Sequence, residues 1–336
     1  MNSIVFLLLS LAIILAGAEV FTNGVEWLGK KLDLSDGAVG SILAAVGTAL
    51  PETLIPLIAI LFGSKEMGSQ IGIGAILGAP LMLSTLAMFV TGLAVVGFSR
   101  RRLKGNKVTV DQEVIRRDLG FFLLVFTAAI LAGILPMRRG WQLAIGGFMV
   151  LSYILYAYVT LTTGRNDGNH DEDLRCCYFA PRQDEPGLNV VVLQVLAALA
   201  VIIAGAHTFV GAVTEIAEVY RVPAFALSII IAPIATELPE KFNSVIWISR
   251  DKDTLALGNI SGAMAFQSSL IPALGIFLTS WQLSAGAMVS AILALVAAGF
   301  LYIQVARKGH LSAYDLLWCG AFYGIFLVGV FDGIIR

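Results

Sequence analysis

The sequence predicts an all-α membrane protein with ten transmembrane helices, arranged as two inverted repeats of five helices each. Of its 336 residues, 58% are hydrophobic and 13% are charged, whereas about a quarter of the residues of an average soluble domain are charged. The apolar residues form ten long runs, and each crossing of a bilayer core takes roughly 20 of them. The chain also resembles itself at a separation of 188 residues.

The ten runs fill most of the chain. They are 3–28, 37–63, 69–98, 119–135, 141–163, 189–217, 223–249, 254–279, 283–306 and 312–335. The first run could be read as a signal peptide, but it lacks a basic start and a clear small-residue cleavage site. It also leads into a second patterned helix, so we interpret it as a helix of the mature protein.

The internal repeat is clearest in the second run of each half. A shift by 188 residues places one motif on the other: Thr48, Leu50, Pro51 and Glu52 fall on Thr236, Leu238, Pro239 and Glu240. Such self-similarity indicates a duplicated structural unit. Because five is an odd number of crossings, the two units enter the membrane from opposite sides. We therefore predict one repeat at 1–163 and the other at 189–336, joined by a polar cytoplasmic linker at 164–188.

The distribution of Lys and Arg predicts the orientation. Cytoplasmic loops carry the excess of these residues. Sixteen fall in the loops of one side and five on the other. This places both termini outside and the linker in the cytoplasm, in a multi-pass protein of the inner cell membrane. The carboxylates of the linker could bind a regulatory cation, but a solvated connector is the simpler interpretation.

The motif of the first repeat, Gly47-Thr48-Ala49-Leu50-Pro51-Glu52, places oxygen ligands inside the membrane. Pro51 has no N–H, so the Gly47 carbonyl loses its helical partner. Thr48 and Glu52 are four residues apart and share one face of the helix. A hydroxyl, a carboxylate and a free carbonyl are the ligands that hard cations such as Ca²⁺ and Na⁺ prefer.

The second copy, Ala235-Thr236-Glu237-Leu238-Pro239-Glu240, repeats this arrangement with one more carboxylate. Facing repeats would bring Glu52 and Glu240 together, and two carboxylates in a low dielectric repel unless a proton or a cation lies between them. A lone intramembrane Glu can be a structural hydrogen-bonding group. Two of them at matched positions, beside matched Thr and Pro, favour a cation site.

The third helix of each half should complete the site. In the second repeat it offers neutral oxygens: Asn259, Ser261, Gln267, Ser268 and Ser269. In the first repeat, residues 72–80 are rich in glycine and nearly without ligands. Because small residues allow helices to approach closely, we expect this segment to supply backbone contact rather than coordination.

The two motifs resemble the α-repeats of the sodium/calcium exchanger family, within the cation/Ca²⁺ antiporter superfamily. The family's repeats read Gly-Thr-Ser-Leu-Pro-Glu, followed on the next helix by Gly-Asn-x-x-Gly, which stands here as Gly258-Asn259-Ile260-Ser261-Gly262. The resemblance covers the topology of the whole chain and is specific around 44–80 and 232–268. It implies a secondary antiporter that exchanges Ca²⁺, or another divalent cation, against Na⁺ by alternating access. The alternative is an H⁺-coupled cation exchanger with altered ion selectivity.

The resemblance also implies roles for single residues. Glu52 and Glu240 match the carboxylates that bind Ca²⁺, and Thr48 and Thr236 match threonines that help to bind Na⁺. The backbone carbonyls of two further positions would contribute, namely Ala45 and Pro233. Four residues stand where the family has serines: Ala49, Glu237, Ala75 and Ala263. Ala79 and Gln267 replace its Asn or Asp. Since these changes remove Na⁺ ligands, we expect fewer coupling Na⁺ ions, or protons in their place.

Three charged or titratable residues near the motifs have alternative interpretations. Lys241 lies four residues after Glu237, so it either forms an ion pair with it or extends toward the cytoplasmic interface. Glu19 and His207 are equivalent under the 188-residue shift. They could relay protons along the first helix of each repeat, or His207 could serve packing alone.

Other functional classes fit less well. Three cysteines without zinc spacing should be free thiols, and we expect no prosthetic group. A membrane enzyme would need a His-Glu-x-x-His or similar metal motif, and none occurs. A channel usually builds its pore by oligomeric symmetry, whereas the symmetry here is internal. The expected partners are inorganic cations and the lipid bilayer, without nucleic acid, and we expect a functional monomer.

Overall fold

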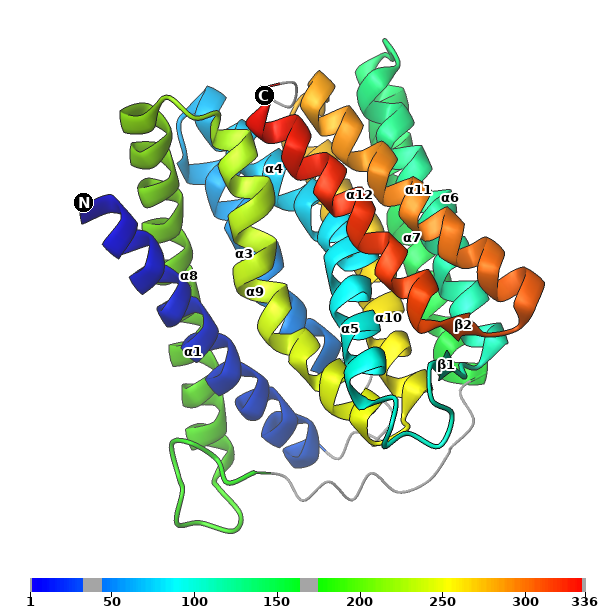
Figure 1. Cartoon of the computed structure of the whole chain (residues 1–336). Helices are drawn as coiled ribbons and strands as arrows, with labels where there is room; N and C mark the ends of the chain where they lie inside the picture. Colours follow the sequence, from blue (N-terminus) through cyan, green and yellow to red (C-terminus); the bar gives the residue numbers. More distant parts are fainter. Residues whose placement is uncertain (1, 33–43, 164–174, 334–336) are drawn as a thin grey trace.

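Helices make up nearly all of the computed structural model, which describes residues 2–32, 44–163 and 175–333 (Figure 1). The first half contains α1 (Asn2–Lys31), α3 (Ala44–Phe62), α4 (Lys65–Met82), the π-helical turn η2 (Leu83–Ala87), α5 (Met88–Phe98), α6 (Gln112–Ile134) and α7 (Arg139–Thr163). The second half contains α8 (Leu188–Tyr220), α9 (Ala224–Ser249), α10 (Asp253–Leu278), α11 (Ala285–Lys308) and α12 (Ala313–Phe331). The two short strands, β1 (Lys107–Val108) and β2 (Leu311–Ser312), pair antiparallel.

Eight candidate membrane spans occur in the described part of the chain, by length and composition. They correspond to α1, the continuous segment Glu66–Phe98, α6, α7, α8, α10, α11 and α12. Within the described residues of α3 and α9, shorter apolar stretches cover Pro51–Phe62 and Ala224–Ile234. The protein is therefore an all-helical, multi-span protein, and the total of ten spans remains a prediction.

The helices form a two-helix layer beside a larger bundle. Figure 1 shows α1 and α8 side by side at one edge of the molecule, and α3 and α9 lie next to them. In the bundle, α4 packs against α9, α12 packs against α5, and both α6 and α7 pack against α10. The candidate site therefore lies where α9 and α10 meet the rest of the bundle.

The seam between α1 and α8 is reciprocal. A Cβ atom on Gly17 would lie 2.8 Å from Cγ1 of Ile202, and one on Gly205 would lie 2.8 Å from Cγ1 of Ile14. The 188-residue shift carries Ile14 onto Ile202 and Gly17 onto Gly205, so each contact is the image of the other. A two-fold axis between the repeats would produce this pattern.

Residues 175–187, which we call the strap, dock on α1 and α8. The buried Gln194 amide donates to Val20 O at 3.0 Å and to Asn23 Oδ1 at 2.9 Å, and its oxygen accepts from the Phe179 N–H at 2.9 Å. Trp27 Nε1 donates to Arg175 O at 2.9 Å. The C-terminal half of the predicted linker is thus attached to both helices. Its remainder, 164–174, lies outside the described residues.

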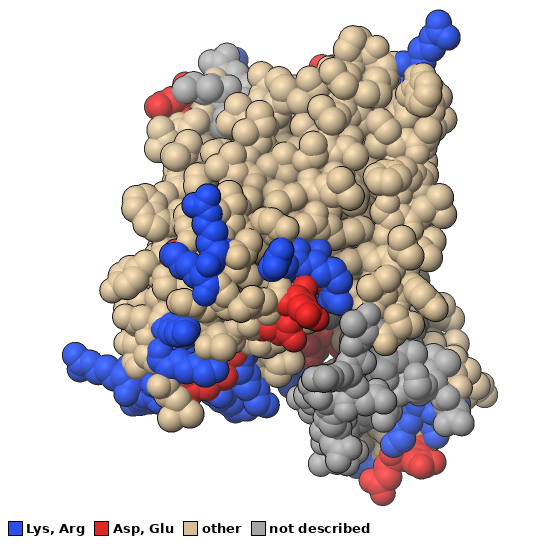
Figure 2. Space-filling model, turned by 90° about the vertical axis from the view of Figure 1, so that its right-hand side faces the viewer, with Lys and Arg blue, Asp and Glu red and all other residues tan. Residues whose placement is uncertain are grey.

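Basic side chains gather toward one end of the molecule (Figure 2). Exposed residues of this kind lie in the connections after α5 and α9 and in the last turn of α11: Arg100, Arg101, Lys104, Lys107, Arg250, Lys252, Arg307 and Lys308. One further Arg in this region is buried. The side chain of Arg102 is 0% exposed and binds the equally buried carboxylate of Asp253 through both Nη atoms, at 2.8 and 2.9 Å.

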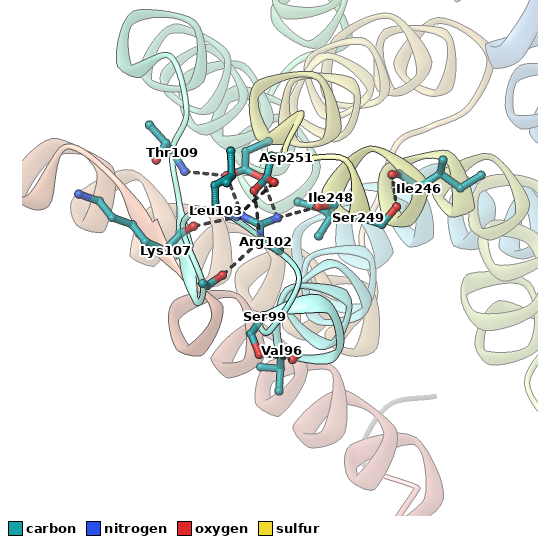
Figure 3. Close-up of polar contacts among 12 residues, drawn as sticks. Val96, Ser99, Arg102, Leu103, Lys107, Thr109, Ile246, Ile248, Ser249 and Asp251 are labelled. Atoms are coloured by element: carbon teal, nitrogen blue, oxygen red, sulfur yellow. Dashed lines mark hydrogen bonds and ion pairs between the residues drawn. The ribbon is translucent and has the colours of Figure 1, made fainter.

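Arg102 ties the α5–α6 connection to the turn between α9 and α10 (Figure 3). Its guanidinium also donates to Ile248 O at 2.9 Å and to Lys107 O at 3.1 Å. The Thr109 N–H donates to the same Asp253 carboxylate at 2.9 Å. Pairing of β1 with β2 extends these contacts, which we call the Arg102 clamp, to the α11–α12 connection, so three connections are joined.

Loss of Gln194 should loosen the strap. Gln194→Leu leaves the Phe179 N–H and the Asn23 side chain short of a partner, and each unsatisfied buried polar group costs about 1–3 kcal/mol. We expect faster protease cleavage within 175–187 in detergent. Gln304→Leu, on the half-buried face of α11, is the matched control. Equal cleavage rates for the two variants would refute the docking role.

Loss of Arg102 should destabilise the whole bundle. Removing one partner of a buried ion pair leaves an uncompensated charge and costs roughly 3–5 kcal/mol. Arg102→Leu should therefore lower the Tm in detergent clearly. Arg102→Lys should lower the Tm less, because lysine keeps the positive charge but cannot bind both carboxylate oxygens of Asp253 as the two Nη atoms of arginine do. Arg101→Leu removes an exposed neighbour and should leave the Tm nearly unchanged. Equal shifts in Tm for Arg101→Leu and Arg102→Leu would refute the stabilising role of the buried Arg102–Asp253 pair.

Candidate cation-binding site

The centre of α9 carries the polar residues of the second motif into the protein interior. Thr236 is 3% exposed and Glu237 is 1% exposed. Pro233 precedes them in the helix and is also buried, and Pro239 follows. Because each proline lacks an N–H, the carbonyls four residues earlier, at Ile229 and Ala235, lose their helical partners. The helix therefore presents free backbone oxygens beside buried polar side chains.

Thr236 is oriented by its own helix. Its hydroxyl donates to Ala232 O at 3.1 Å. Because the Thr236 hydroxyl donates its hydrogen in this bond, the lone pairs of its oxygen remain available for another contact. The predicted role of Thr236 as an oxygen ligand is therefore compatible with this geometry.

Glu237 and Gln267 meet between α9 and α10. Gln267 Nε2 donates to Glu237 Oε1 at 2.6 Å, and Gln267 is 2% exposed. A hydrogen bond to a carboxylate is short and strong when it is shielded from water. Two of the predicted site residues, 30 positions apart in the chain, are thus brought into direct contact. The side chain of Lys241 lies outside the described residues, so both interpretations of it stay open.

The first motif is described in part. Glu52 on α3 is buried, at 7% exposure, and the Thr53 hydroxyl donates to Ala49 O at 2.6 Å. Helix α3 contacts α9, which is the packing that a shared site requires. The side chains of three predicted ligands lie outside the described residues: Ala45, Thr48 and Glu240. The approach of Glu52 to Glu240 therefore remains a prediction.

The glycine-rich segment of α4 lies close to the backbone of α9. A Cβ atom on Gly78 would lie 2.5 Å from Ile229 O and 2.7 Å from Pro233 Cγ, and one on Gly74 would lie 2.8 Å from Phe225 O. The expectation of close backbone contact is confirmed. The close approach brings α4 onto Pro233, at the edge of the site.

The neutral oxygens of α10 divide into two groups. Ser268 and Ser269 are buried, and their hydroxyls donate to Ala265 O at 3.2 and 2.6 Å, within the helix. Asn259 is half-exposed. Ser261 instead donates to Asp118 Oδ2 of α6, at 2.7 Å. Its hydroxyl hydrogen is directed to α6, and its expected role as a neutral oxygen of the site stays a prediction.

Sequence reasoning missed Asp118. Its side chain is 2% exposed, but it directly precedes the apolar run 119–135 and resembles an ordinary polar residue of a helix end. Only its tertiary partners distinguish it. Glu19 likewise gains a distant partner, because its carboxylate pairs with Arg175 of the strap at 2.9 Å, while His207 is exposed on α8.

Cysteine and metal-ligand chemistry add no second centre in the described part of the chain. Cys176, Cys177 and Cys319 are free thiols, as predicted. Among the described side chains, which exclude Glu240, no group of three or more His, Cys, Asp or Glu residues gathers. The oxygen ligands of α3, α9 and α10 are therefore the candidate site.

A multi-span helical bundle with buried oxygen ligands on a proline-interrupted helix defines a membrane transport protein. The chain belongs to the sodium/calcium exchanger protein family, whose sequence model matches residues 2–162 and 190–331. The two matched segments lie on either side of the linker and coincide closely with the two predicted repeats. The resemblance noted from the motifs is therefore confirmed.

Relatives and solved structures agree with this assignment. The putative antiporter CaxA of Alkalimonas amylolytica is 25% identical over 325 residues, which are 93% of this chain and 94% of that protein. The sodium/calcium exchanger MaX1 of Methanosarcina acetivorans is 22% identical over 289 residues, 76% of this chain and 77% of its own.

Two solved exchangers share the fold. The H⁺/Ca²⁺ exchanger CAX superimposes with a TM-score of 0.72 at 19% identity, over 98% of this chain and 82% of that chain. The sodium-calcium exchanger NCX_Mj, soaked with Na⁺ and Sr²⁺, superimposes with a TM-score of 0.58 at 19% identity, over 97% of this chain and 98% of that chain.

The close approach of α4 to α9 predicts that Gly78 cannot carry a side chain. In Gly78→Ala the new methyl group would press on the backbone oxygen of Ile229, and such overpacking costs about 1–3 kcal/mol. We expect a lower Tm in detergent. Gly97→Ala on α5 is the control, because no described atom lies within 4 Å of its added Cβ. A Tm for Gly78→Ala at or above that of Gly97→Ala would contradict the packing.

Proposed function

We propose that the protein is an antiporter that exchanges Ca²⁺, or another divalent cation, against Na⁺ by alternating access. One observation carries the proposal. Thr236 and Glu237 of the proline-interrupted helix α9, and Gln267 of the neighbouring α10, are all at most 3% exposed in the apolar bundle. Burying such groups is costly in a membrane, and intramembrane ionisable residues mark ion pathways by default.

The divalent cation would bind between the two repeats. We assign Glu52 and Glu240 as its carboxylate ligands, since two like charges in a low dielectric need a cation or a proton between them. The burial of Glu52 and the contact of α3 with α9 support this. Further oxygens would come from the side chains and backbone of these residues: Thr48, Thr236, Ala45, Pro233, Asn259 and Ser268.

The fold would be an inverted repeat of ten crossings with both termini outside. The reciprocal contacts of Gly17 with Ile202 and of Gly205 with Ile14 support a two-fold axis. The two segments matched by the family description support repeats at 1–163 and 189–336. The basic end seen in Figure 2 would then face the cytoplasm.

Alternating access requires one part of the molecule to move against another. We infer that the α1–α8 layer moves against the bundle, because the resemblance to the sodium/calcium exchanger family implies a first helix in each repeat that slides to switch access. The strap would hold the two helices together as they move. In contrast, the Arg102 clamp fixes the bundle at its basic end.

Protons are the second candidate for the coupling ion. The specific observation is Glu237, a buried titratable group where the family has a serine. Three alanines, Ala49, Ala75 and Ala263, further remove hydroxyls that Na⁺ would use. One solved structure that shares the fold is described as an H⁺/Ca²⁺ exchanger and another as a sodium-calcium exchanger, so both couplings occur on this fold.

Uptake of ⁴⁵Ca²⁺ into proteoliposomes under imposed Na⁺ and pH gradients tests the function and the coupling together. We expect saturable uptake that needs a counter-ion. Glu52→Gln and Glu240→Gln should each reduce it to the background of empty liposomes, because each removes a charged ligand.

Glu218→Gln, at an exposed position near the end of α8, is the control and should transport normally. Normal uptake by Glu52→Gln would refute the assignment of Glu52 as a ligand of the divalent cation. Uptake without any counter-ion would instead indicate a channel.

A further inference from the structure

A buried carboxylate outside the proposed site joins three helices. Asp118 of α6 is 2% exposed. Its Oδ2 accepts from Ser261 Oγ of α10 at 2.7 Å, and its Oδ1 accepts from the Tyr156 hydroxyl of α7 at 2.8 Å. The neighbouring Arg117 donates to Oδ1 at 3.1 Å and offsets its charge. Each oxygen of the carboxylate is therefore committed to a defined donor.

The partners of Asp118 are themselves held in place. The ring of Tyr156 stacks on Phe121 with a centroid distance of 4.6 Å, and the Arg117 guanidinium lies 5.5 Å from the same ring. A carboxylate with rigid surroundings can fix the position of the group that it binds. The group fixed here is Ser261 of α10.

Helix α10 also carries Gln267, which binds Glu237 in the proposed site. Ser261 precedes Gln267 by six residues, which corresponds to about 240° around the helix axis. The two side chains therefore leave α10 in different directions, one toward α6 and the other toward α9. Two hydrogen bonds on different sides of one helix define its rotation.

Two glycines of α10 near Ser261 add no side-chain contacts. Gly258 and Gly262 flank Ser261 and have no side chains to interdigitate with neighbouring helices. One turn further on, α10 and α7 meet again where Phe266 packs edge-on against Tyr153, with a centroid distance of 5.5 Å. The Asp118–Ser261 bond thus lies between two positions of α10 at which an added Cβ would meet no described atom within 4 Å.

We propose that Asp118 is a positioning residue for cation exchange: together with Tyr156 it holds Ser261, and so fixes the rotation of α10 that presents Gln267 to Glu237 and directs Ser268. This inference rests on the proposed function for its effect on transport. The hydrogen bonds that carry it lie outside the proposed ligand set. Its structural part can therefore be tested separately.

The transport test uses Ser261→Ala and Asp118→Asn in proteoliposomes. We expect the apparent KM for Ca²⁺ to rise about tenfold, which is the scale of one hydrogen bond to a charged group, while the maximal rate stays within about twofold. The double variant should be no worse than Asp118→Asn alone, because residues of one network are not additive. Ser261→Thr keeps the hydroxyl and should restore the KM.

Ser290→Ala is the matched control. Ser290 is also fully buried, but its hydroxyl donates only to Ala287 O within α11, at 2.8 Å, so its loss should leave the KM unchanged. A fall in the maximal rate and the Tm with an unchanged KM would show that Asp118 only stabilises the bundle. Failure of Ser261→Thr to restore the KM would overturn the proposal as well.

Amide hydrogen exchange in detergent gives a readout that does not depend on transport. Ser261→Ala should speed exchange in peptides covering 258–270 and leave α11 unchanged, whereas Ser290→Ala should not affect 258–270. If the wild-type protein transports no cation, the proposed function fails. Faster amide hydrogen exchange in 258–270 of Ser261→Ala would still support the conclusion that the Asp118–Ser261 bond fixes the rotation of α10. Unchanged amide protection of residues 258–270 in Ser261→Ala would refute the proposed role of the Asp118–Ser261 bond.

Discussion

Lipid offers no hydrogen bonds, so each carboxylate and amide inside the bundle must find its partner within the protein. Helix α10 meets this demand at three levels, through Asp253 at its start, Ser261 in its third turn and Gln267 near its middle. The partners are Arg102, Asp118 and Glu237, from three different elements. This places α10 in a frame of polar contacts, and the geometry of the candidate site depends on that frame.

The α1–α8 layer is built on a different principle. Its seam uses Gly17 and Gly205 to admit Ile202 and Ile14, and apolar surfaces can shift past a neighbour without breaking hydrogen bonds. Polar contacts concentrate instead at one end, where Gln194 binds α1 and the strap. A polar frame around α10 and an apolar layer beside it divide the molecule into a part that defines the site and a part suited to movement.

Local signals in the sequence predicted the helical class, the buried motif of α9 and the close approach of α4, because each follows from hydropathy, proline or glycine at named positions. Tertiary partners could not be predicted in the same way. Gln267 was expected as an oxygen ligand of the cation, but the bond from its amide nitrogen to Glu237, 30 positions away, was not predicted. Arg102 counted only as a loop charge, although it is fully buried. Asp118 resembled a helix-end residue because its donors, Tyr156 and Ser261, lie 38 and 143 positions away.

Charge balance links the two ions that the proposed exchange involves. Glu237 and Glu240 lie three residues apart in the sequence of α9, and in the proposed site Glu52 would face them from α3. A divalent cation offsets two of these three carboxylates. The Gln267 amide donates a hydrogen bond to Glu237 but carries no full charge, so in the proposed site a proton, Lys241 or a monovalent cation would balance the third carboxylate. A divalent cation that enters this site would compete with the group that balances that charge. By thermodynamic linkage the reverse holds as well, so the same carboxylate that departs from the family pattern would connect divalent binding to release of the counter-ion.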